Sequence, residues 1–438
     1  MDLVERVRRH LASLNLPSGP ALVAVSGGAD SVALLDLLVA TADYHPLQLV
    51  VAHVDHGIHP ESHAAAELVR SLAGAYRLDF ELITLALGSA AGETAARAAR
   101  YAALLAAAER GGAVALLTAH HADDQVETVI MRFLAGSGPA GLAGMARTRG
   151  RIVRPLLPFR RDELAHHVRT RALPSWSDPA NADPRHLRSW LRGTALPMLR
   201  ARLPELDQRV LRTARHAADD RAAWDAALEV LNLEPRPDAD GISVAAHPLR
   251  GYDSALASAL VRAAARRVGC VLGPTRAAAV LRLVERGASG RSVPLAATWR
   301  AELTFDRLRI VRTVRAAVEP QTVAGNSGEC RWGEWTLRWR TEAAPGRQSR
   351  TGDSAWFAPG SLEVRAWRPG DRMRPLAGRG GRPLVQCFQE ARVPRSRRSE
   401  WPVLAAGDSI LWVPGVCRSE HRVPPAGAEA LRVDAGHA

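Results

Sequence analysis

A chain of 438 residues is longer than a single hydrophobic core usually supports, so we expect two or three domains. Hydrophobic residues make up 47% of the chain and charged residues 24%, which is typical of a soluble globular protein. No apolar run approaches the roughly 20 residues that cross a bilayer. The charged start, Met1 to Arg6, is also unlike a secretory signal. We therefore expect a cytoplasmic protein that has no membrane partner.

The charge favours a polyanionic partner such as nucleic acid, since the formal net charge is +13 and the pI is near 10.9. A genome rich in G and C would also raise the arginine content, so the charge alone decides little. The chain contains no lysine, and all 58 strongly basic residues are arginines. This excludes Schiff-base chemistry on a lysine and the phosphate-binding lysine of a Walker A loop.

The cysteines are too few and too widely spaced for a disulfide framework or a Cys-x-x-Cys site. We expect them to be buried or incidental thiols. They are Cys270, Cys330, Cys387 and Cys417.

In the first part of the chain, strand-like apolar runs alternate with helical stretches, which predicts a doubly wound α/β domain with a parallel sheet. The expected strands are 21–25, 47–54, 80–85 and 114–118. The expected helices are 31–40, 61–76 and 93–110. Helical, arginine-rich sequence continues to about Asp225.

Two further domains are expected after a break rich in Pro and Asp at 234–238. Helices near 255–268 and 275–285 indicate a small α-rich domain, ending in strands near 301–314. Recurring tryptophans and β-branched residues then predict a C-terminal α+β domain with much β structure. We set the domains at 1–215, 220–317 and 328–438.

The segment Ser26-Gly27-Gly28-Ala29-Asp30-Ser31 directly follows the first strand and opens a helix. Glycine lets a phosphate approach the backbone, and the amides of a helix N-terminus attract it. Asp30 is a candidate ligand of Mg²⁺ that bridges phosphate oxygens. An ordinary capped helix start is the alternative. The segment resembles the SGGxDS loop of the PP-loop ATP-pyrophosphatase superfamily, which implies ATP binding and transfer of AMP to a carbonyl oxygen.

His53 lies at the end of the second strand and begins a polar stretch that runs to Ser62. Its three histidines and two acids suggest either a metal site or polar residues at a helix start. The stretch resembles the H-V-D-H-G segment of the tRNA(Ile)-lysidine synthases, which implies that His53 lies beside the nucleotide.

On the third expected helix, Arg97, Arg100 and Tyr101 share one face. Such a face is often only solvated or packed. The same resemblance implies that Arg97 and Arg100 bind the nucleotide, where arginine replaces the missing lysine.

The string from Thr118 to Thr128, which includes His120, Asp124 and Glu127, again follows a strand. If a helix begins near Asp123, the two acids lie one turn apart and can bind a cation or an ammonium group. The string resembles the H-H-A-D-D-Q-x-E-T motif of the lysidine synthases. This implies that His120 contacts the nucleotide and that Asp30, Asp124, Glu127 and Arg192 are catalytic.

Two other regions carry the resemblance. Around Arg188 and Arg192 the chain resembles the family's R-N-x-I/V-R segment, but Ser189 replaces the usual asparagine and Ala180 a usual serine or threonine. The glycine-rich loop 136–141 is either a helix stop or a substrate contact. Segments beginning at Trp367, Val393 and Trp412 resemble the family's C-terminal tRNA-contacting domain.

The resemblance implies that L-lysine is ligated to carbon 2 of the wobble cytidine of tRNA(Ile) with a CAU anticodon. The expected cofactors are ATP and Mg²⁺, and the partners are this tRNA, free L-lysine and a second copy of the chain in a homodimer. A tRNA thiolase and an amidotransferase are disfavoured because no cysteine lies in the first domain. A catalytically silent RNA-binding protein is disfavoured because it has no need of acids beside a polyanion.

Overall fold

The computed structural model describes residues 2–55, 62–85, 93–176, 187–238, 240–296, 298–313, 319–378 and 380–437. The chain forms two compact units, Met1–Ala223 and Trp224–Ala438. Among the described residues, no helix is long and apolar enough to cross a membrane. Cys270, Cys387 and Cys417 are buried, as expected, whereas Cys330 is half-buried, and all four are free thiols.

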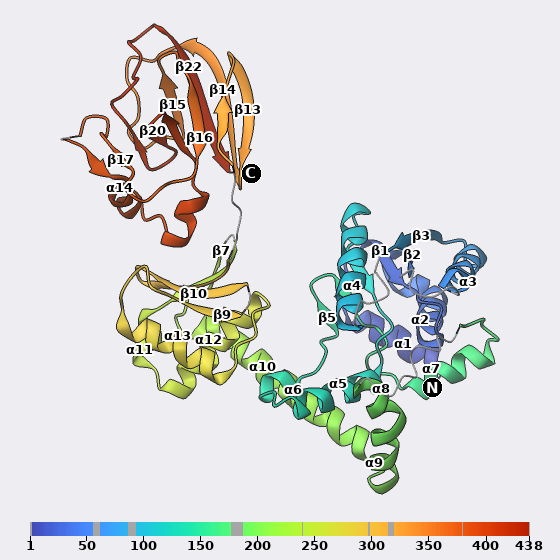
Figure 1. Ribbon diagram of the computed structural model, residues 1–438. Helices are drawn as coiled ribbons and strands as arrows, with labels where there is room; N and C mark the ends of the chain where they lie inside the picture. The colour runs from blue at the N-terminus through green and yellow to red at the C-terminus, as the bar shows by residue number, and fades with distance from the viewer. Residues whose placement is uncertain are drawn as a thin grey trace. The chain divides into compact units, whose positions relative to one another are not determined.

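The first unit is built on a six-stranded sheet with the order β3-β2-β1-β4-β6-β5 (Figure 1). All neighbouring strands are parallel except β5 and β6. The strands are β1 (Gly19–Ala24), β2 (Leu47–Asp55), β3 (Asp79–Thr84), β4 (Ala115–Leu117), β5 (Thr148–Arg149) and β6 (Ile152–Val153). Each of the four predicted strands is therefore present, with ends within two residues of the expected ones.

The helices begin with α1, which precedes β1, then alternate with the strands and continue as a helical segment after β6, whose last helix, α10, extends past Ala223. They are α1 (Leu3–Ser13), α2 (Ala29–Ala40), η1 (Ala42–Tyr44), α3 (Ser62–Ala75), α4 (Glu93–Arg110), α5 (Ala122–Leu134), α6 (Pro139–Leu142), α7 (Arg161–Thr170), α8 (Leu187–Trp190), η3 (Leu191–Ala195), α9 (Leu196–Arg202) and α10 (Leu206–Val230). The predicted helices 31–40, 61–76 and 93–110 correspond to α2, α3 and α4.

Alternate residues of β1 pack on opposite faces of the sheet, as the two-residue period of a strand requires. Ala21 and Val23 belong to the main core, which also contains residues of α1, α2, α3 and α7. Leu22 belongs to a second core on the other face, which includes Leu104 and Ala108 of α4. Helices thus cover both faces, and the predicted doubly wound fold is confirmed.

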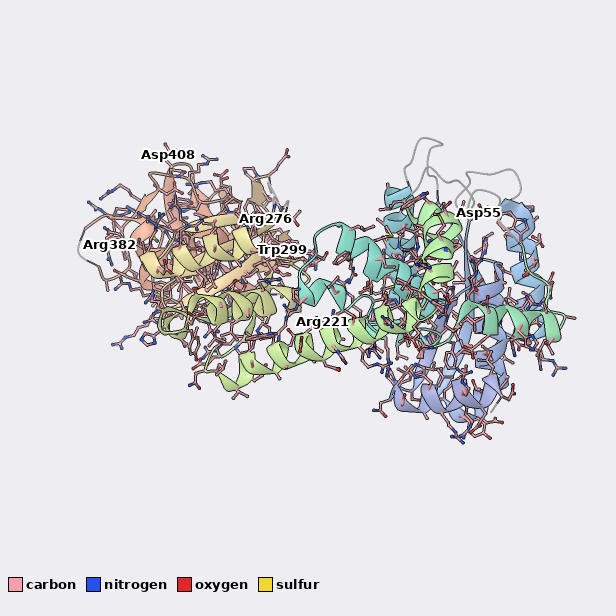
Figure 2. The ribbon with its side chains drawn as sticks, turned by 90° about the horizontal axis from the view of Figure 1, so that it is seen from below. Asp55, Arg221, Arg276, Trp299, Arg382 and Asp408 are labelled. Atoms are coloured by element: carbon pink, nitrogen blue, oxygen red, sulfur yellow. The ribbon has the colours of Figure 1, made fainter. Side chains whose placement is uncertain are left out.

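The strand order reverses between β1 and β4, because the chain goes from β1 to β2 and β3 on one side before it returns to β4 on the other. In open α/β sheets, ligands bind at such a reversal, outside the carboxyl ends of the strands. The loops that follow β1 and β4 therefore meet at the expected position of a binding site. Asp55, at the end of β2, marks the same edge (Figure 2).

The second unit begins with a five-stranded antiparallel sheet of order β7-β8-β11-β10-β9. Its core includes residues of the predicted helices, which appear as α12 and α13. A short strand, β7, occupies part of the predicted break at 234–238. The elements are β7 (Arg236–Asp238), β8 (Gly241–Ala245), α11 (His247–Gly251), α12 (Ser254–Arg267), α13 (Pro274–Arg286), β9 (Ser292–Ala296), β10 (Trp299–Thr304) and β11 (Arg307–Arg312).

The remainder of this unit is rich in antiparallel β structure, as predicted, around a core that contains Trp332, Trp335, Trp339 and Trp412. A smaller core lies around α14. The elements are β12 (Gln321–Val323), β13 (Ser327–Trp332), β14 (Trp335–Ala343), β15 (Ser354–Phe357), β16 (Leu362–Arg365), β17 (Arg372–Met373), β18 (Arg382–Pro383), α14 (Leu384–Glu390), η4 (Arg395–Glu400), β19 (Val403–Ala406), β20 (Ser409–Val413), β21 (Cys417–Arg418) and β22 (Glu429–His437).

Candidate active site

The loop after β1, residues 26–31, is called the phosphate loop below. Gly27 has a φ of +87°, in the left-handed region where a side chain is strained. The Ser31 hydroxyl donates to the Gly28 carbonyl at 2.8 Å and accepts from the Ser26 amide at 3.1 Å. These bonds fold the loop back over the first turn of α2.

Helix α2 begins without a side-chain cap, because Gly28 occupies the capping position. The amides of Ala29 and Asp30 in the first turn therefore remain available to an anion at the positive end of the helix. The Asp30 carboxylate lies in the same turn and its side chain is 33% exposed. A phosphate and a carboxylate-bound cation fit together in this arrangement.

His53 lies under the phosphate loop. Its Nδ1 lies 2.9 Å from the carbonyl oxygen of Val25, the residue directly before the loop, and it donates there. Burial lowers the pKa of His53, so the ring is neutral at pH 7. This contact ties the end of β2 to the end of β1, while the predicted contact between His53 and the nucleotide remains a prediction.

His120 follows β4 and is surrounded by donors. Arg97 and Tyr101 of α4 lie 3.0 and 3.4 Å from its Nε2, and Thr118 lies 3.1 Å from its Nδ1. Arginine can only donate, so Nε2 accepts and the proton lies on Nδ1, facing the Thr118 hydroxyl. Burial lowers the pKa of His120 to about 3, and the ring stays neutral.

Sequence reasoning missed Arg154 in this cluster. Burial lowers its pKa, whereas its hydrogen bond to Tyr101 acts in the opposite direction. Its only sequence signal is that it directly follows β6 at the carboxyl edge of the sheet. Arg100 lies on α4, three residues after Arg97, and its predicted role at the nucleotide remains a prediction.

His121 joins the phosphate loop to α5, and it is the second residue that the sequence reasoning missed as a site residue. Its Nε2 lies 3.5 Å from Oδ2 of Asp30 and 3.5 Å from Oδ2 of Asp124. Burial opposes the charged ring, but Asp30, Asp124 and Asp123 outweigh it and raise the pKa of His121 above 6.5. The imidazole also caps α5 by accepting the Asp124 amide.

Asp124 and Glu127, called the acid pair below, lie one turn apart on α5, which begins at Ala122 as predicted. Two arginines, called the arginine pair, bind both acids. Arg192 donates to Glu127 at 2.6 and 2.9 Å and to Asp124 at 3.1 Å. Arg188 donates to Glu127 at 2.8 Å and to Asp124 at 2.9 Å. Arg188 was not among the predicted site residues.

The electrostatics of the acid pair favour charged groups. Burial raises the pKa of Asp124, but His121 and Arg188 lower it more, and the net pKa lies below the ordinary value. The Glu127 side chain is only 3% exposed. Burial also acts against a charged Arg192, but its bonds to Glu127 raise its pKa further. Both acids thus keep a positively charged partner in this state.

Asp123 faces away from the acid pair. It accepts from Arg160 at 2.7 and 3.1 Å and from the Arg161 amide at 2.8 Å, which joins α5 to the start of α7. Arg160 also binds Asp207 at 2.5 Å. The two neighbouring acids therefore have different roles: Asp123 stabilises the fold, and Asp124 lies in the candidate site.

The glycine-rich loop 136–141 is fastened to α5. Arg132 donates to the carbonyl oxygens of Gly141 and Gly144 at 2.9 and 2.8 Å. Gln125 accepts from the Met145 amide at 2.7 Å. These bonds favour the helix-stop interpretation over a direct substrate contact.

Some predictions concern residues outside the described ranges. These are the polar stretch after Asp55, residues 56–61, and the segment 177–186, which contains Ala180. In the C-terminal region Phe388 is fully buried and packs against Trp367, with the two ring centroids 6.4 Å apart.

Comparisons with known proteins identify the family. A family model described as a PP-loop domain matches residues 3–199, and one described as a TilS substrate C-terminal domain matches residues 362–434. The tRNA(Ile)-lysidine synthase of Alkalilimnicola ehrlichii is 38% identical over 93% of this chain and 92% of the relative. The enzymes of that name from Symbiobacterium thermophilum and Geobacter sulfurreducens are 32% and 33% identical, covering 99% and 95% of this chain and 98% and 93% of the relatives.

Proposed function

Because the chain belongs to the tRNA(Ile)-lysidine synthase family, we propose that it joins L-lysine to carbon 2 of the wobble cytidine of tRNA(Ile) with a CAU anticodon. The reaction consumes ATP and releases AMP and pyrophosphate, and it changes the codon that is read from AUG to AUA. One observation carries the proposal: the acid pair lies beside the phosphate loop and is linked to it through His121.

In the first step the phosphate loop holds the phosphates of ATP against the amides at the start of α2. The oxygen on carbon 2 of the cytosine attacks the α-phosphorus, an oxygen–phosphorus bond forms, and pyrophosphate leaves. Arg97 and Arg100 of α4 stabilise the negative charge that develops on pyrophosphate, and the neutral His120 holds Arg97 in position by accepting its hydrogen bond. The product is an adenylated cytidine.

Asp30 is the residue that fits Mg²⁺. Magnesium is usually held by one or two carboxylates together with substrate phosphates, not by a cage of protein ligands. This suits a single partly exposed carboxylate at an uncapped helix start. No cluster of three His, Cys, Asp or Glu residues suited to a metal occurs in the described part of the chain. The ion would neutralise phosphate charge when bound.

In the second step the acid pair receives the amine of lysine. The amine nitrogen bonds to carbon 2 of the cytosine, the bond from carbon 2 to the AMP oxygen breaks, and AMP leaves. Asp124 and Glu127 orient the incoming ammonium, and one of them accepts its proton. Arg192 holds these acids in position, and we propose it as a catalytic residue together with them. The arginine pair must yield part of its contacts as lysine enters.

The division into domains 1–215, 220–317 and 328–438 is part of the proposal, in which the last two contact the tRNA. The C-terminal match over residues 362–434 and exposed arginines such as Arg276 support this (Figure 2). Since tRNA, ATP and lysine meet in the cytoplasm, we place the reaction there. A homodimer remains part of the hypothesis.

The experiment uses the full chain with ATP, Mg²⁺, radiolabelled lysine and tRNA(Ile) carrying CAU. We expect ATP-dependent label on this tRNA and none on a tRNA with a different wobble base. Without transfer of label the function fails. Transfer that persists in Asp30→Ala would refute the assigned site but leave the function intact. Label from a sulfur donor would favour a thiolase, although all four cysteines lie at or beyond Cys270.

A further inference from the structure

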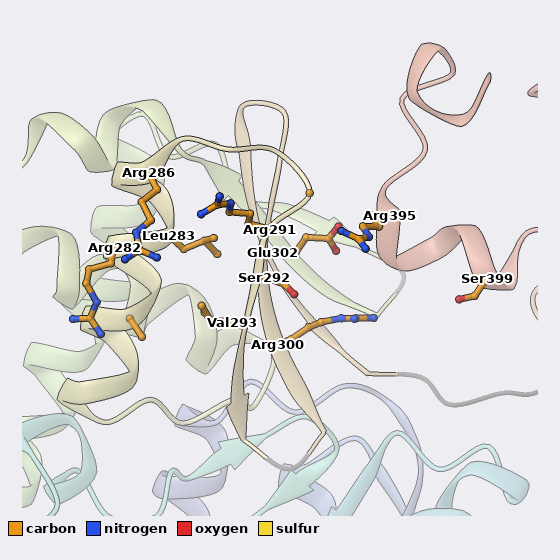
Figure 3. Close-up of a pocket in the computed structure, with 12 residues that line it drawn as sticks. Arg282, Leu283, Arg286, Arg291, Ser292, Val293, Arg300, Glu302, Arg395 and Ser399 are labelled. Atoms are coloured by element: carbon orange, nitrogen blue, oxygen red, sulfur yellow. The ribbon is translucent and has the colours of Figure 1, made fainter. Parts of the chain in front are cut away.

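The second unit contains a cavity of about 800 Å³ whose wall is unusually basic. Helix α13 contributes Arg282 and Arg286 on one side, and the β9–β10 region contributes Arg291 and Arg300 (Figure 3). Arg395, from the start of η4, lies on the opposite side. Four of these five arginines thus come from one continuous stretch of α13, β9 and β10.

None of these five arginines makes an ion pair with an Asp or Glu in the described part of the chain. Other arginines of the same unit do have acidic partners: Arg266 binds Asp225 at 2.8 Å and Arg309 binds Asp238 at 2.7 Å. Arg300 Nε is buried and has no hydrogen-bond partner. Collecting like charges without counterions costs free energy through mutual repulsion. An anionic ligand would remove this cost.

Only one acid lines the cavity, Glu302 of β10. It is buried, and its Oε2 lies 3.4 Å from Arg309, which also binds Asp238, while its Oε1 has no hydrogen-bond partner among the described residues. Five arginines and one acid therefore line the cavity, so the charge of its wall is net positive. Guanidinium groups bind phosphate oxygens with paired hydrogen bonds.

We propose that this cavity binds consecutive backbone phosphates of the tRNA substrate, and this inference rests on the proposed function. A second cavity of about 450 Å³ shares Gly290, Glu302 and Arg395 with it and is also lined by Phe305 and Trp367. Phe305 is 40% exposed. Arginines beside one exposed aromatic ring, that of Phe305, suit a nucleotide chain, whose phosphates and bases are bound together, better than a free phosphate.

The test measures binding of full-length tRNA(Ile) by filter retention at several salt concentrations, with no catalysis required. The variants are Arg286→Gln, Arg291→Gln and Arg300→Gln, singly and combined. The logarithm of the association constant for tRNA falls linearly with the logarithm of the salt concentration. Each lost phosphate contact lowers the magnitude of this slope by about 0.7 to 0.9. We expect each single variant to weaken binding roughly three- to tenfold at low salt. The matched control is Arg338→Gln, which removes an exposed arginine already paired with Glu329 in the same unit.

The control should retain wild-type affinity within about twofold, and all variants should retain the wild-type melting curve. At saturating tRNA the kcat for lysine transfer should be unchanged while the KM for tRNA rises. Unchanged tRNA affinity and salt slope in the triple variant would overturn the proposal. A triple variant that loses binding of tripolyphosphate but not of tRNA would overturn it too, in favour of a free anion. If the wild type transfers no lysine while the variants still lose tRNA binding as expected, the proposed function is refuted and this site is not.

Discussion

The Nε2 atom of His121 lies 3.5 Å from Oδ2 of Asp30, so the loop after β4 reaches the phosphate loop after β1. The two residues are 91 positions apart in the chain, yet they follow the adjacent parallel strands β1 and β4, whose carboxyl ends lie side by side. The same imidazole lies 3.5 Å from Asp124. A change of charge at Asp30 therefore alters the electrostatic potential at the acid pair through His121.

Removing the charge of Asp30 should lower the pKa of His121. Burial already acts in that direction, and Asp30 is the first of the acids that raise the pKa. We expect Asp30→Asn to move the His121 pKa down toward or below about 6.5. An NMR titration of labelled histidine in the ligand-free protein measures the shift. Asp162→Asn, at an exposed acid in the first turn of α7, is the control and should leave the value unchanged.

Two alanine substitutions in the phosphate loop should separate stability from nucleotide binding. Gly27→Ala places a side chain at φ +87° and should cost about 1 kcal/mol of unfolding free energy. Gly28→Ala meets only ordinary contacts, with Ser26 Oγ at 3.6 Å and Trp176 O at 3.9 Å. It should leave stability unchanged yet raise the KM for ATP at least tenfold, because the methyl group occupies the phosphate approach. A Gly28→Ala enzyme with normal KM for ATP would contradict the loop's role.

Glu127→Gln should destabilise the protein, since the arginine pair loses one of its two acids in a largely buried setting. The expected loss is about 2 to 3 kcal/mol, because both arginines retain some access to water. Urea unfolding with an unchanged m value measures it. Glu329→Gln breaks an exposed pair and should cost no more than about 0.5 kcal/mol. The KM for lysine should rise in the first variant alone.

The lowered pKa of His120 predicts that the free energy of unfolding depends on pH. Its folded pKa of about 3 lies below the ordinary value, so the folded state favours the neutral ring. The resulting stability is full above about pH 6.5 and is lost as the pH falls toward 3. Between pH 7.5 and 5.5 the wild type should lose more unfolding free energy than His120→Gln. Equal losses in the two proteins would mean that the imidazole is not held neutral.

Much of the first unit follows from short-range patterns. Apolar strands and alanine-rich helices define the sheet, and residues 26–31 stood out because glycines at a strand-to-helix turn match the SGGxDS pattern, while their binding of phosphate remains a prediction. The acids on α5 were found because their spacing matches one helical turn. These features depend on neighbours in the sequence.

The missed residues depend on long-range contacts. Arg188 meets the acid pair across 61 and 64 positions, and Arg154 reaches Tyr101 of α4 from the end of β6. The sequence does not distinguish His121 from its neighbour His120 electrostatically, although burial lowers the pKa of His120 and nearby acids raise that of His121. Only tertiary packing decides these cases.

The arginine pair has a consequence for how substrates are admitted. Two bare carboxylates would repel the phosphates of an approaching tRNA and would attract any small cation in the cell. The charges of Arg188 and Arg192 balance those of Asp124 and Glu127. The acid pair therefore neither repels the tRNA phosphates nor attracts small cations. Only a ligand that replaces a guanidinium with its own ammonium group keeps that balance. Under the proposed function, the resting site therefore selects its amine by exchange of one positive group for another, and not by attraction to uncompensated negative charge.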